Sequence, residues 1–233
     1  MERKVALSLA IPFFNEEPNV VPVLNDLVEA LDAEGVAFEI LAVDNGSSDA
    51  TGRLIEGLHA RDARIVPVKI QTNRGYGYGI LTGLREAKGA VVGYAWGDGQ
   101  VSSADVARIY IAFEGSTAQM AKACRTERHD GLFRLVQTRC YALVFTLLFG
   151  PGIRDPNGCP KLFRRESFAS IAPVSNGWLL DPEIMVKARR LDYEVLNIPV
   201  VFRKRERGLS KISPFTSLGF FLGLIKMRFS LPG

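Results

Sequence analysis

Short apolar runs alternate with helix-length segments through the first half of the chain. The apolar pattern predicts strands at Val5–Ile11, Phe38–Val43, Ile65–Ile70 and Val91–Ala95. The helices expected between and after them are Val20–Leu31, Ala50–Leu58, Ile80–Glu86 and Ala104–Phe113. Strands with so few polar residues are typical of a parallel sheet that is covered on both faces. We therefore expect an α/β fold.

In open parallel sheets, ligands bind beyond the carboxyl ends of the strands. The segments that follow the four strands are Pro12–Glu17, Asp44–Asp49, Asn73–Gly79 and Asp98–Gln100. Glu16 and Asp44 can accept hydrogen bonds from ribose hydroxyls or from a base N–H group, and Gly75, Gly77 and Gly79 would allow the backbone to approach a bulky ligand. A nucleotide fits this set of residues.

Two structural alternatives apply to these acidic residues. Asp44 and Asp49 can instead cap the next helix, and Glu16 and Glu17 can form a solvated first turn. The run NRGYGYG follows the third strand and lacks the spacing of a dinucleotide fingerprint, and no P-loop motif occurs. Neither a nicotinamide cofactor nor a P-loop nucleotide site is therefore expected.

Composition narrows the class of protein further. With 233 residues, 47% hydrophobic and 23% charged, the chain has the profile of a globular protein, and we expect one domain. The net charge is only +4, but basic residues gather at 125–139 and 203–211, which indicates an anionic ligand or surface and no nucleic acid. The three cysteines lack metal-ligand spacing, which favours a reducing, cytoplasmic location.

Two apolar segments, Leu132–Phe149 and Pro214–Arg228, stand out in the second half. Neither reaches the roughly 18 apolar residues that a membrane span needs. Each can be a core helix or lie in a membrane interface with its cations toward the headgroups. For Pro214–Arg228 we expect interfacial contact, because its apolar positions run nearly all round a helix.

Five motifs together carry a resemblance to a known family. They are IPFFNEE, VDNGSSDAT, NRGYGYGILTGLREAKGAVVGYAWGDGQ, RDPNGCPKLFRRE and RKRERGLSK. In order and spacing they resemble the family-two glycosyltransferases of GT-A fold, and within these the synthases that load a sugar onto dolichyl or another polyprenyl phosphate. The resemblance implies a GT-A domain over residues 1–212, with a donor half at about 1–115 and an acceptor half at about 116–212, followed by an apolar interfacial segment at 213–233.

The resemblance also implies an activity. Such enzymes move a hexose with inversion from a GDP- or UDP-linked donor to a polyprenyl phosphate, with Mg²⁺ or Mn²⁺ on the donor diphosphate, at the cytoplasmic face of the membrane. The donor-binding positions that match are Pro12, Phe14, Glu16, Asp44, Asn73, Gly75 and Asp98. Phe14 replaces the tyrosine of the family motif, and Asn45 replaces its second aspartate.

The metal-binding motif of the family, D-x-D followed by x-Q, is matched in part. Asp98 and Gln100 correspond to its second aspartate and its glutamine, whereas Trp96 stands in place of the first aspartate. Magnesium often uses only one or two protein carboxylates and completes its shell with phosphate and water oxygens. One aspartate is therefore chemically sufficient, with reduced affinity.

A phosphate acceptor requires cations, and arginine suits it through forked hydrogen bonds. The positions that match the family's acceptor residues are Arg125, Arg134, Thr138, Arg205, Ser210 and Lys211. A lipid phosphate is mostly dianionic at neutral pH and needs no strong base. We name Asp98, Arg125, Arg205 and Lys211 as catalytic candidates.

Two other functions remain open from the sequence. A sugar or hydroxyl acceptor would need a base, for which Asp181 is the candidate, although Asp181 can also cap a helix. Trp96 and Asn45 suggest instead a protein that binds the donor without catalysis. The segment 155–161, DPNGCPK, departs from the Ser-Gly-Phe-Arg pattern of the family and leaves the acceptor open.

Overall fold

A seven-stranded sheet forms the centre of the computed structural model, which describes residues 4–127, 141–203 and 214–230. The strands are β1 (Leu7–Phe13), β2 (Phe38–Asn45), β3 (Ile65–Ile70), β4 (Val91–Tyr94), β5 (Met120–Glu127), β6 (Lys161–Arg164) and β7 (Val195–Val201). Their order across the sheet is β3-β2-β1-β4-β6-β5-β7. β6 runs antiparallel to β4 and β5, whereas the other neighbouring pairs are parallel.

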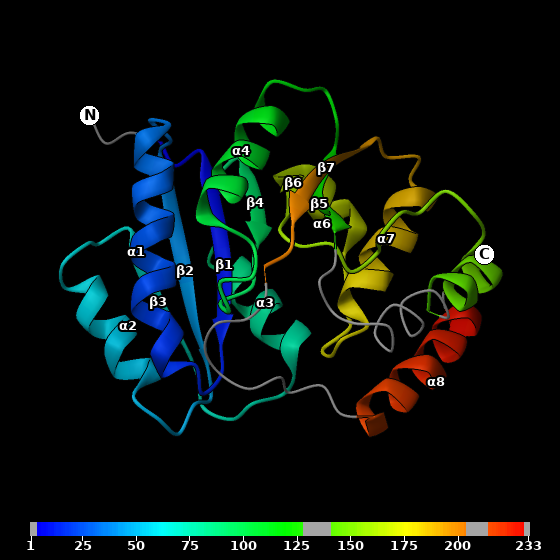
Figure 1. Ribbon diagram of the computed structural model, residues 1–233, viewed down its shortest axis with the longest axis horizontal. Coiled ribbons are helices and arrows are strands. Elements are labelled where there is room, and N and C mark those ends of the chain that lie inside the picture. The colour runs from blue at the N-terminus through cyan, green and yellow to red at the C-terminus, as the bar shows by residue number, and fades with distance from the viewer. Residues whose placement is uncertain (1–3, 128–140, 204–213, 231–233) are drawn as a thin grey trace.

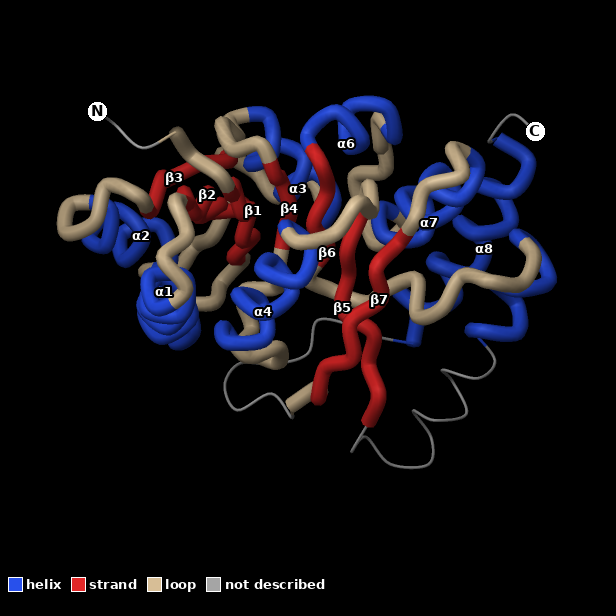
Figure 2. The backbone as a smooth tube through the Cα atoms, turned by 90° about the horizontal axis from the view of Figure 1, so that it is seen from above, coloured by secondary structure: helices blue, strands red, loops and turns tan. Residues whose placement is uncertain are grey.

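Helices cover both faces of this sheet. They are α1 (Glu17–Ala33), α2 (Thr51–His59), α3 (Tyr76–Arg85), α4 (Ser103–Glu114), α6 (Arg165–Ile171), α7 (Leu180–Arg190) and α8 (Pro214–Ser230), together with a helical segment at residues 141–149. One apolar cluster joins the sheet to α1, α2 and α4, and a second joins it to α3, α6 and α7. Figure 2 shows α1 and α4 on one side of the strands and α3 and α6 on the other. The α/β prediction is confirmed.

The predicted strands match the structure closely, and the third has the same bounds in both. The largest difference in this half is α3, which begins at Tyr76 although the sequence predicts a start at Ile80. Glycines are poor helix formers, so Gly77 and Gly79 led us to place this stretch in a loop. In the structure both glycines lie within α3, Gly77 against Ser175 and Gly79 against the Asn45 side chain, so tertiary packing outweighs their low helix propensity.

A third layer lies outside α7, where α8 and helix 141–149 pack side by side (Figure 1). Phe145, Val186, Leu224 and Met227 form its buried apolar centre. None of the helices among the described residues is long and apolar enough to cross a bilayer. This layer sits at the end of the molecule opposite α1 and α2 (Figure 1).

Candidate functional site at the carboxyl edge of the sheet

The loops after β1 and β2 are joined by reciprocal hydrogen bonds. The Asn15 amide donates to Ser47 Oγ at 3.0 Å, and the Ser48 amide donates to Asn15 Oδ1 at 2.8 Å. The Glu16 amide donates to Thr51 Oγ1 at 3.0 Å. The first two predicted donor loops therefore form one connected edge, which begins where Pro12 and Phe13 pair with β2.

The two carboxylates predicted to meet the donor are buried at this edge, Glu16 with 7% and Asp44 with 9% exposure. Glu16 Oε2 accepts a hydrogen bond from Asn19 Nδ2 at 2.6 Å. Asp44 Oδ1 accepts from the Ser47 amide at 2.9 Å, and a Cβ at Gly52 would lie 2.5 Å from Asp44 Oδ2. Asp44 thus organises the turn after β2 at the carboxyl end of that strand. It does not cap α2, whose N-cap is Ala50 without a side-chain cap.

Asp49 fits the capping alternative. Its Oδ1 accepts from the Thr51 amide at 3.0 Å, and its Oδ2 accepts from the Glu17 amide at 3.2 Å. In return, the Glu17 carboxylate accepts from the Ala50 amide at 3.1 Å. These bonds hold the starts of α1 and α2 together.

The glycines before and within α3 contact another part of the chain. A Cβ at Gly75 would lie 2.6 Å from the Asn176 carbonyl oxygen, and one at Gly77 would lie 2.2 Å from that of Ser175. The Tyr78 amide donates to the Asn176 oxygen at 2.8 Å. Gly75 and Gly77 thus allow the segment before α7 to pack closely, whereas a Cβ at Gly79 would meet the side chain of Asn45. This segment is absent from the local sequence pattern, so only the tertiary structure reveals it.

The turn that carries Asp98 follows β4. Gly97 is required because a Cβ there would lie 2.5 Å from the ring of Phe13, and Gly99 has a left-handed φ of 70°. Asp98 is half-buried, and its Oδ1 accepts from the Gln100 amide at 3.2 Å. Ser102 caps α4 by accepting from the Asp105 amide at 3.1 Å, so Asp98 is not the cap of this helix.

Two hydrogen bonds connect this turn to the end of β7. The Gln100 side-chain amide donates to the Arg203 carbonyl at 3.1 Å, and the Arg203 amide donates to the Gln100 carbonyl at 2.9 Å. Since Gln100 Nε2 is a donor here, Oε1 is the side-chain atom with acceptor capacity for a cation. In sequence, the basic run 203–211 begins at the same point.

The side chains of this turn fit a metal ion only in part. Among the described residues no group of three or more His, Cys, Asp or Glu side chains is arranged to hold a metal ion. A carboxylate and an amide oxygen can still hold Mg²⁺ or Mn²⁺ when donor phosphates and water supply the remaining ligands. The residues therefore fit an ion that is shared with a diphosphate.

Trp96, which stands in place of the first metal-binding aspartate, serves as an aromatic support. Its indole N–H donates to the Tyr76 hydroxyl at 2.8 Å, and its ring meets that of Phe202 edge-on with centroids 5.6 Å apart. Tyr76 in turn stacks on Trp178 at 4.8 Å. Burial, followed by the charge of Asp181, raises the pKa of Tyr76 well above its usual value, so this hydroxyl keeps its proton. Through Tyr76 and Trp178, Trp96 thus connects the end of β4 with α3 and the start of α7.

Asp181 lies in a buried ion pair. Its Oδ1 accepts from Lys161 Nζ and from the Tyr94 hydroxyl, the latter at 2.6 Å, and the exposed fractions of Asp181 and Lys161 are 3% and 0%. Lys161 Nζ also donates to the Gly158 carbonyl at 2.7 Å. No side chain caps α7, so Asp181 is not its cap. A carboxylate that is neutralised by a buried lysine is poorly suited to act as a general base.

Arg125, the described member of the predicted acceptor set, lies inside β5. Its Nε donates to Asp155 Oδ2 at 2.9 Å, and its Nη2 donates to Oδ1. Burial opposes ionisation of Asp155, but the hydrogen bonds and charge of Arg125 outweigh it and lower the pKa of Asp155 to about 2. The Arg125 guanidinium also lies 5.5 Å from the centre of the Phe202 ring.

Lys122 was missed by the sequence analysis. It is fully buried, pairs with Lys161 across β5 and β6, and donates from Nζ to the Asp155 carbonyl at 2.9 Å. Burial, followed by the charge of Lys161, lowers the pKa of Lys122 to about 8. The available signal was a lysine between the apolar residues of MAKAC. The other acceptor candidates, Arg134, Thr138, Arg205, Ser210 and Lys211, lie outside the described residues.

Solved structures similar to this one support the fold. A glucosyl-3-phosphoglycerate synthase from Mycobacterium tuberculosis, solved with Mn²⁺, uridine diphosphate and glucosyl-3-phosphoglycerate, superposes with a TM-score of 0.72 at 17% identity. The match covers 98% of this chain and 81% of that one. The architecture is the GT-A fold that the sequence predicts.

Curated relatives are similar over 97% of the chain. An undecaprenyl-phosphate 4-deoxy-4-formamido-L-arabinose transferase of Pectobacterium carotovorum is 25% identical, and a dolichyl-phosphate beta-glucosyltransferase of Trichomonas vaginalis is 29% identical. A dodecaprenyl-phosphate galacturonate synthase of Rhizobium johnstonii is 25% identical. The chain spans 66%, 72% and 68% of these three proteins. The family model of glycosyl transferase family 2 matches residues 8–172, and this chain belongs to that family.

Proposed function

We propose that the protein transfers a hexose, with inversion, from a GDP- or UDP-linked donor to a polyprenyl phosphate at the cytoplasmic face of a membrane. The observation that carries this proposal is the pair of hydrogen bonds between Gln100 and Arg203. They bring the Asp98 turn, where a donor diphosphate would lie, to the start of the basic run 203–211. A site for the leaving group and a source of cations for an anionic acceptor therefore adjoin.

On the donor side, Glu16 and Asp44 would accept hydrogen bonds from the nucleoside, with Pro12, Phe14, Asn73 and Gly75 around it. Asp98 and Gln100 would hold Mg²⁺ or Mn²⁺. When bound, the metal stabilises the negative charge of the departing diphosphate. Trp96 supports this turn through Tyr76 and Phe202 and adds no charge to the site.

On the acceptor side, Arg134, Arg205 and Lys211 would contribute positive charge, helped by Thr138 and Ser210, and Arg125, which is paired with Asp155, would contribute its guanidinium as a hydrogen-bond donor. The phosphate of such an acceptor is itself the nucleophile, and its own charge makes a strong base unnecessary. The buried Lys161–Asp181 pair agrees with this choice, since it leaves Asp181 neutralised. Similarity to relatives named for undecaprenyl-, dolichyl- and dodecaprenyl-phosphate also supports a lipid phosphate as acceptor.

A transfer assay tests the proposal. The protein is incubated with radiolabelled UDP- or GDP-hexoses and a short polyprenyl phosphate in detergent, with and without Mn²⁺. We expect a glycolipid that requires metal and a loss of at least about a hundredfold in Asp98→Ala, the scale of removing one charge-stabilising group. Asp26→Ala, at an exposed position of α1, is the matched control and should retain activity. Absence of glycolipid with every donor would contradict the proposal.

Trp96 favours a second candidate, a protein that binds the donor without transferring the sugar. Its indole occupies the position of a metal-binding carboxylate and is engaged with Tyr76. Calorimetry separates the two functions. Nucleotide binding that metal does not strengthen, together with no turnover, would support the second candidate over the first.

A further inference from the structure

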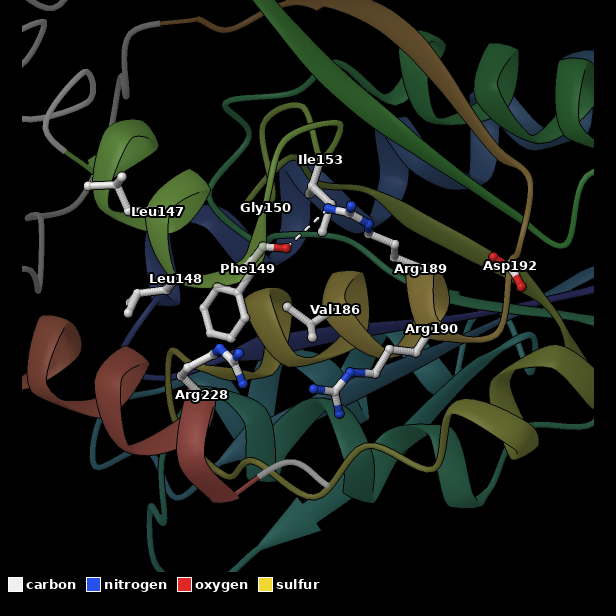
Figure 3. A pocket seen from close by; sticks show the side chains of 10 residues that line it. All are labelled: Leu147, Leu148, Phe149, Gly150, Ile153, Val186, Arg189, Arg190, Asp192 and Arg228. Carbon is white, nitrogen blue, oxygen red and sulfur yellow. Dashed lines mark hydrogen bonds between the residues drawn. The ribbon is translucent and has the colours of Figure 1, made fainter. Parts of the chain in front are cut away.

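A hollow of about 600 Å³ lies between helix 141–149, the end of α7 and the end of α8. Its apolar wall includes Leu147, Phe149 and Val186, and its polar groups are Arg189, Arg190, Asp192 and Arg228. Figure 3 shows the ring of Phe149 in the middle of this surface, with Arg190 and Arg228 reaching toward each other from α7 and α8. Three segments that are distant in sequence therefore build one basic and apolar cavity.

The wall of the hollow is held in place by Arg189. Its Nη1 donates to the Phe149 carbonyl at 3.1 Å and to the Pro151 carbonyl at 2.5 Å. Gly150, with a left-handed φ of 83°, allows this approach, because a Cβ there would lie 3.2 Å from Arg189 Nη1. The chain after helix 141–149 is thereby fixed to the end of α7, which gives the hollow a defined shape.

The charge of the hollow is predominantly positive, with three arginines and one aspartate. Guanidinium groups form charge-assisted, forked hydrogen bonds with phosphates. Arg228 is exposed at the end of α8, where a cation also interacts favourably with the helix dipole. The hollow therefore suits a phosphate-bearing group that also carries apolar substituents.

Exposed apolar side chains lie on two of the helices that border the hollow. On helix 141–149, Leu143 and Leu147 are 62% and 75% exposed, and on α8, Leu222, Ile225 and Phe229 are 60%, 44% and 83% exposed. The three α8 residues follow a helical spacing and lie on the face opposite the buried Leu224 and Met227. Exposed apolar residues with arginines beside them are the composition of helices that lie in a membrane interface.

We propose that this hollow binds the phosphate of an anionic phospholipid while the surrounding leucines and Phe229 enter the bilayer surface. The hollow shares no lining residue with the proposed donor, metal and acceptor positions. It lies at the last turn of α7, where Arg189 is about 12 Å along the helix axis from Asp181 in the first turn, at 1.5 Å per residue. The proposal rests on the membrane location in the proposed function and makes no use of its chemistry. It assigns a second phosphate site, for a lipid that is not consumed.

Vesicle flotation tests this assignment. The protein is mixed with vesicles of phosphatidylcholine alone or with 30 mol% phosphatidylglycerol. We expect binding at least tenfold tighter to the anionic vesicles, and at least a tenfold loss in Arg190→Glu/Arg228→Glu, since each basic residue near such a surface contributes about fivefold. Arg53→Glu/Arg61→Glu, with the same change of charge on and just after α2, should bind as the wild type does. Equal losses in both double variants would overturn the assignment to the hollow.

Two further experiments test the contribution of the exposed apolar residues and the source of the phosphate. Phe229→Ser should weaken binding to anionic vesicles severalfold, whereas Val174→Ser, which alters a residue that is 73% exposed elsewhere, should not. Inorganic phosphate at 20 mM should not displace the protein from vesicles. Displacement by phosphate would mean that the hollow recognises a free anion. Binding that is indifferent to Phe229→Ser would mean that this apolar side chain does not enter the bilayer. Either result would refute the bilayer proposal.

The transfer assay in detergent keeps the two proposals distinguishable. Arg190→Glu/Arg228→Glu should retain transfer to a detergent-soluble polyprenyl phosphate while it loses vesicle binding. Asp98→Ala should retain vesicle binding while it loses transfer. Vesicle binding through the hollow without transfer by any variant would refute the proposed function alone.

Discussion

The two halves of the sheet that we propose for the donor and the acceptor stabilise buried and edge carboxylates in different ways. In the donor half, Glu39 accepts from the Ser8 hydroxyl at 2.6 Å and the Lys88 amide at 2.7 Å, and Asp44 accepts from the Ser47 amide. In the acceptor half, Asp155 pairs with Arg125 and Asp181 pairs with Lys161. Glu39 lies near the amino end of β2, whereas Asp44 lies at the carboxyl edge, where its neutral amide donor does not cancel its charge. A negative charge there suits a metal and ribose hydroxyls, whereas paired lysines and arginines balance the charge beside the proposed acceptor.

The largest effect expected from this comparison is the breaking of the buried Lys161–Asp181 pair. Lys161→Met or Asp181→Asn should lower the free energy of unfolding by about 3–5 kcal/mol, because each leaves an uncompensated polar or charged group in the interior. Urea unfolding measures the change. Lys187→Met breaks the partly exposed pair with Glu183, at 2.6 Å, and should cost less.

This experiment also decides the role of Asp181. If Asp181→Asn left stability intact and abolished transfer, the ion pair would be dispensable and the general-base hypothesis would be restored. We predict instead that Asp181→Asn lowers the free energy of unfolding. The double variant Lys161→Met/Asp181→Leu should recover part of that stability, since an apolar pair needs no charge compensation.

The next largest effect concerns the pH dependence of Lys122. Its pKa is about 8 in the folded protein, against an ordinary value of 10.5. Between these values the unfolded chain binds the extra proton, so the free energy of unfolding should rise with pH from about 8 to about 10.5. The rise should approach about 3 kcal/mol, at about 1.4 kcal/mol per pH unit.

Lys122→Met should abolish this rise. The measurement is the difference in unfolding free energy between wild type and variant at several pH values, which cancels the titration of other groups. Parallel curves for the two proteins would show that Lys122 stays protonated in the folded state and would remove the proposed cost of its burial.

The smallest effect lies in the donor half. Asp49→Asn retains one oxygen acceptor, which suffices for either the Thr51 or the Glu17 amide, and loses the other, so the unfolding free energy should fall by about 1 kcal/mol. Thermal unfolding gives the value. A loss as large as that of Asp181→Asn would contradict the contrast between neutral and ionic partners.

Local pattern predicted the donor half well because its strands are continuous apolar runs and its loops carry turn residues. In the rest of the chain, the structure depends on long-range contacts that the local pattern does not show. The start of α3 depends on Ser175 and Asn176, about a hundred positions later, which pack against Gly75 and Gly77. The buried lysines of β5 and β6 interrupt the apolar pattern, and their partners Asp155 and Asp181 come from separate loops and helices. Sequence order alone does not bring these charges together.

The candidate site shows the same division. The family motifs predicted Asp98, Gln100 and Arg125 as candidates, and the structure describes the turn and strand that hold them. The link from Gln100 to Arg203 and the support of Trp96 by Tyr76 could not be predicted, because each joins segments that neither motif spacing nor periodicity relates.

A Mn²⁺ titration tests whether Asp98 holds a divalent cation on a donor diphosphate. Electron paramagnetic resonance measures free Mn²⁺ in titrations of the wild type, Asp98→Asn and Asp26→Asn, each with and without UDP or GDP. We predict weak binding of the ion alone, at least tenfold tighter binding with a nucleoside diphosphate that the protein accepts, and loss of that gain in Asp98→Asn only. Equal Mn²⁺ binding by wild type and Asp98→Asn in the presence of the nucleotide would contradict the account.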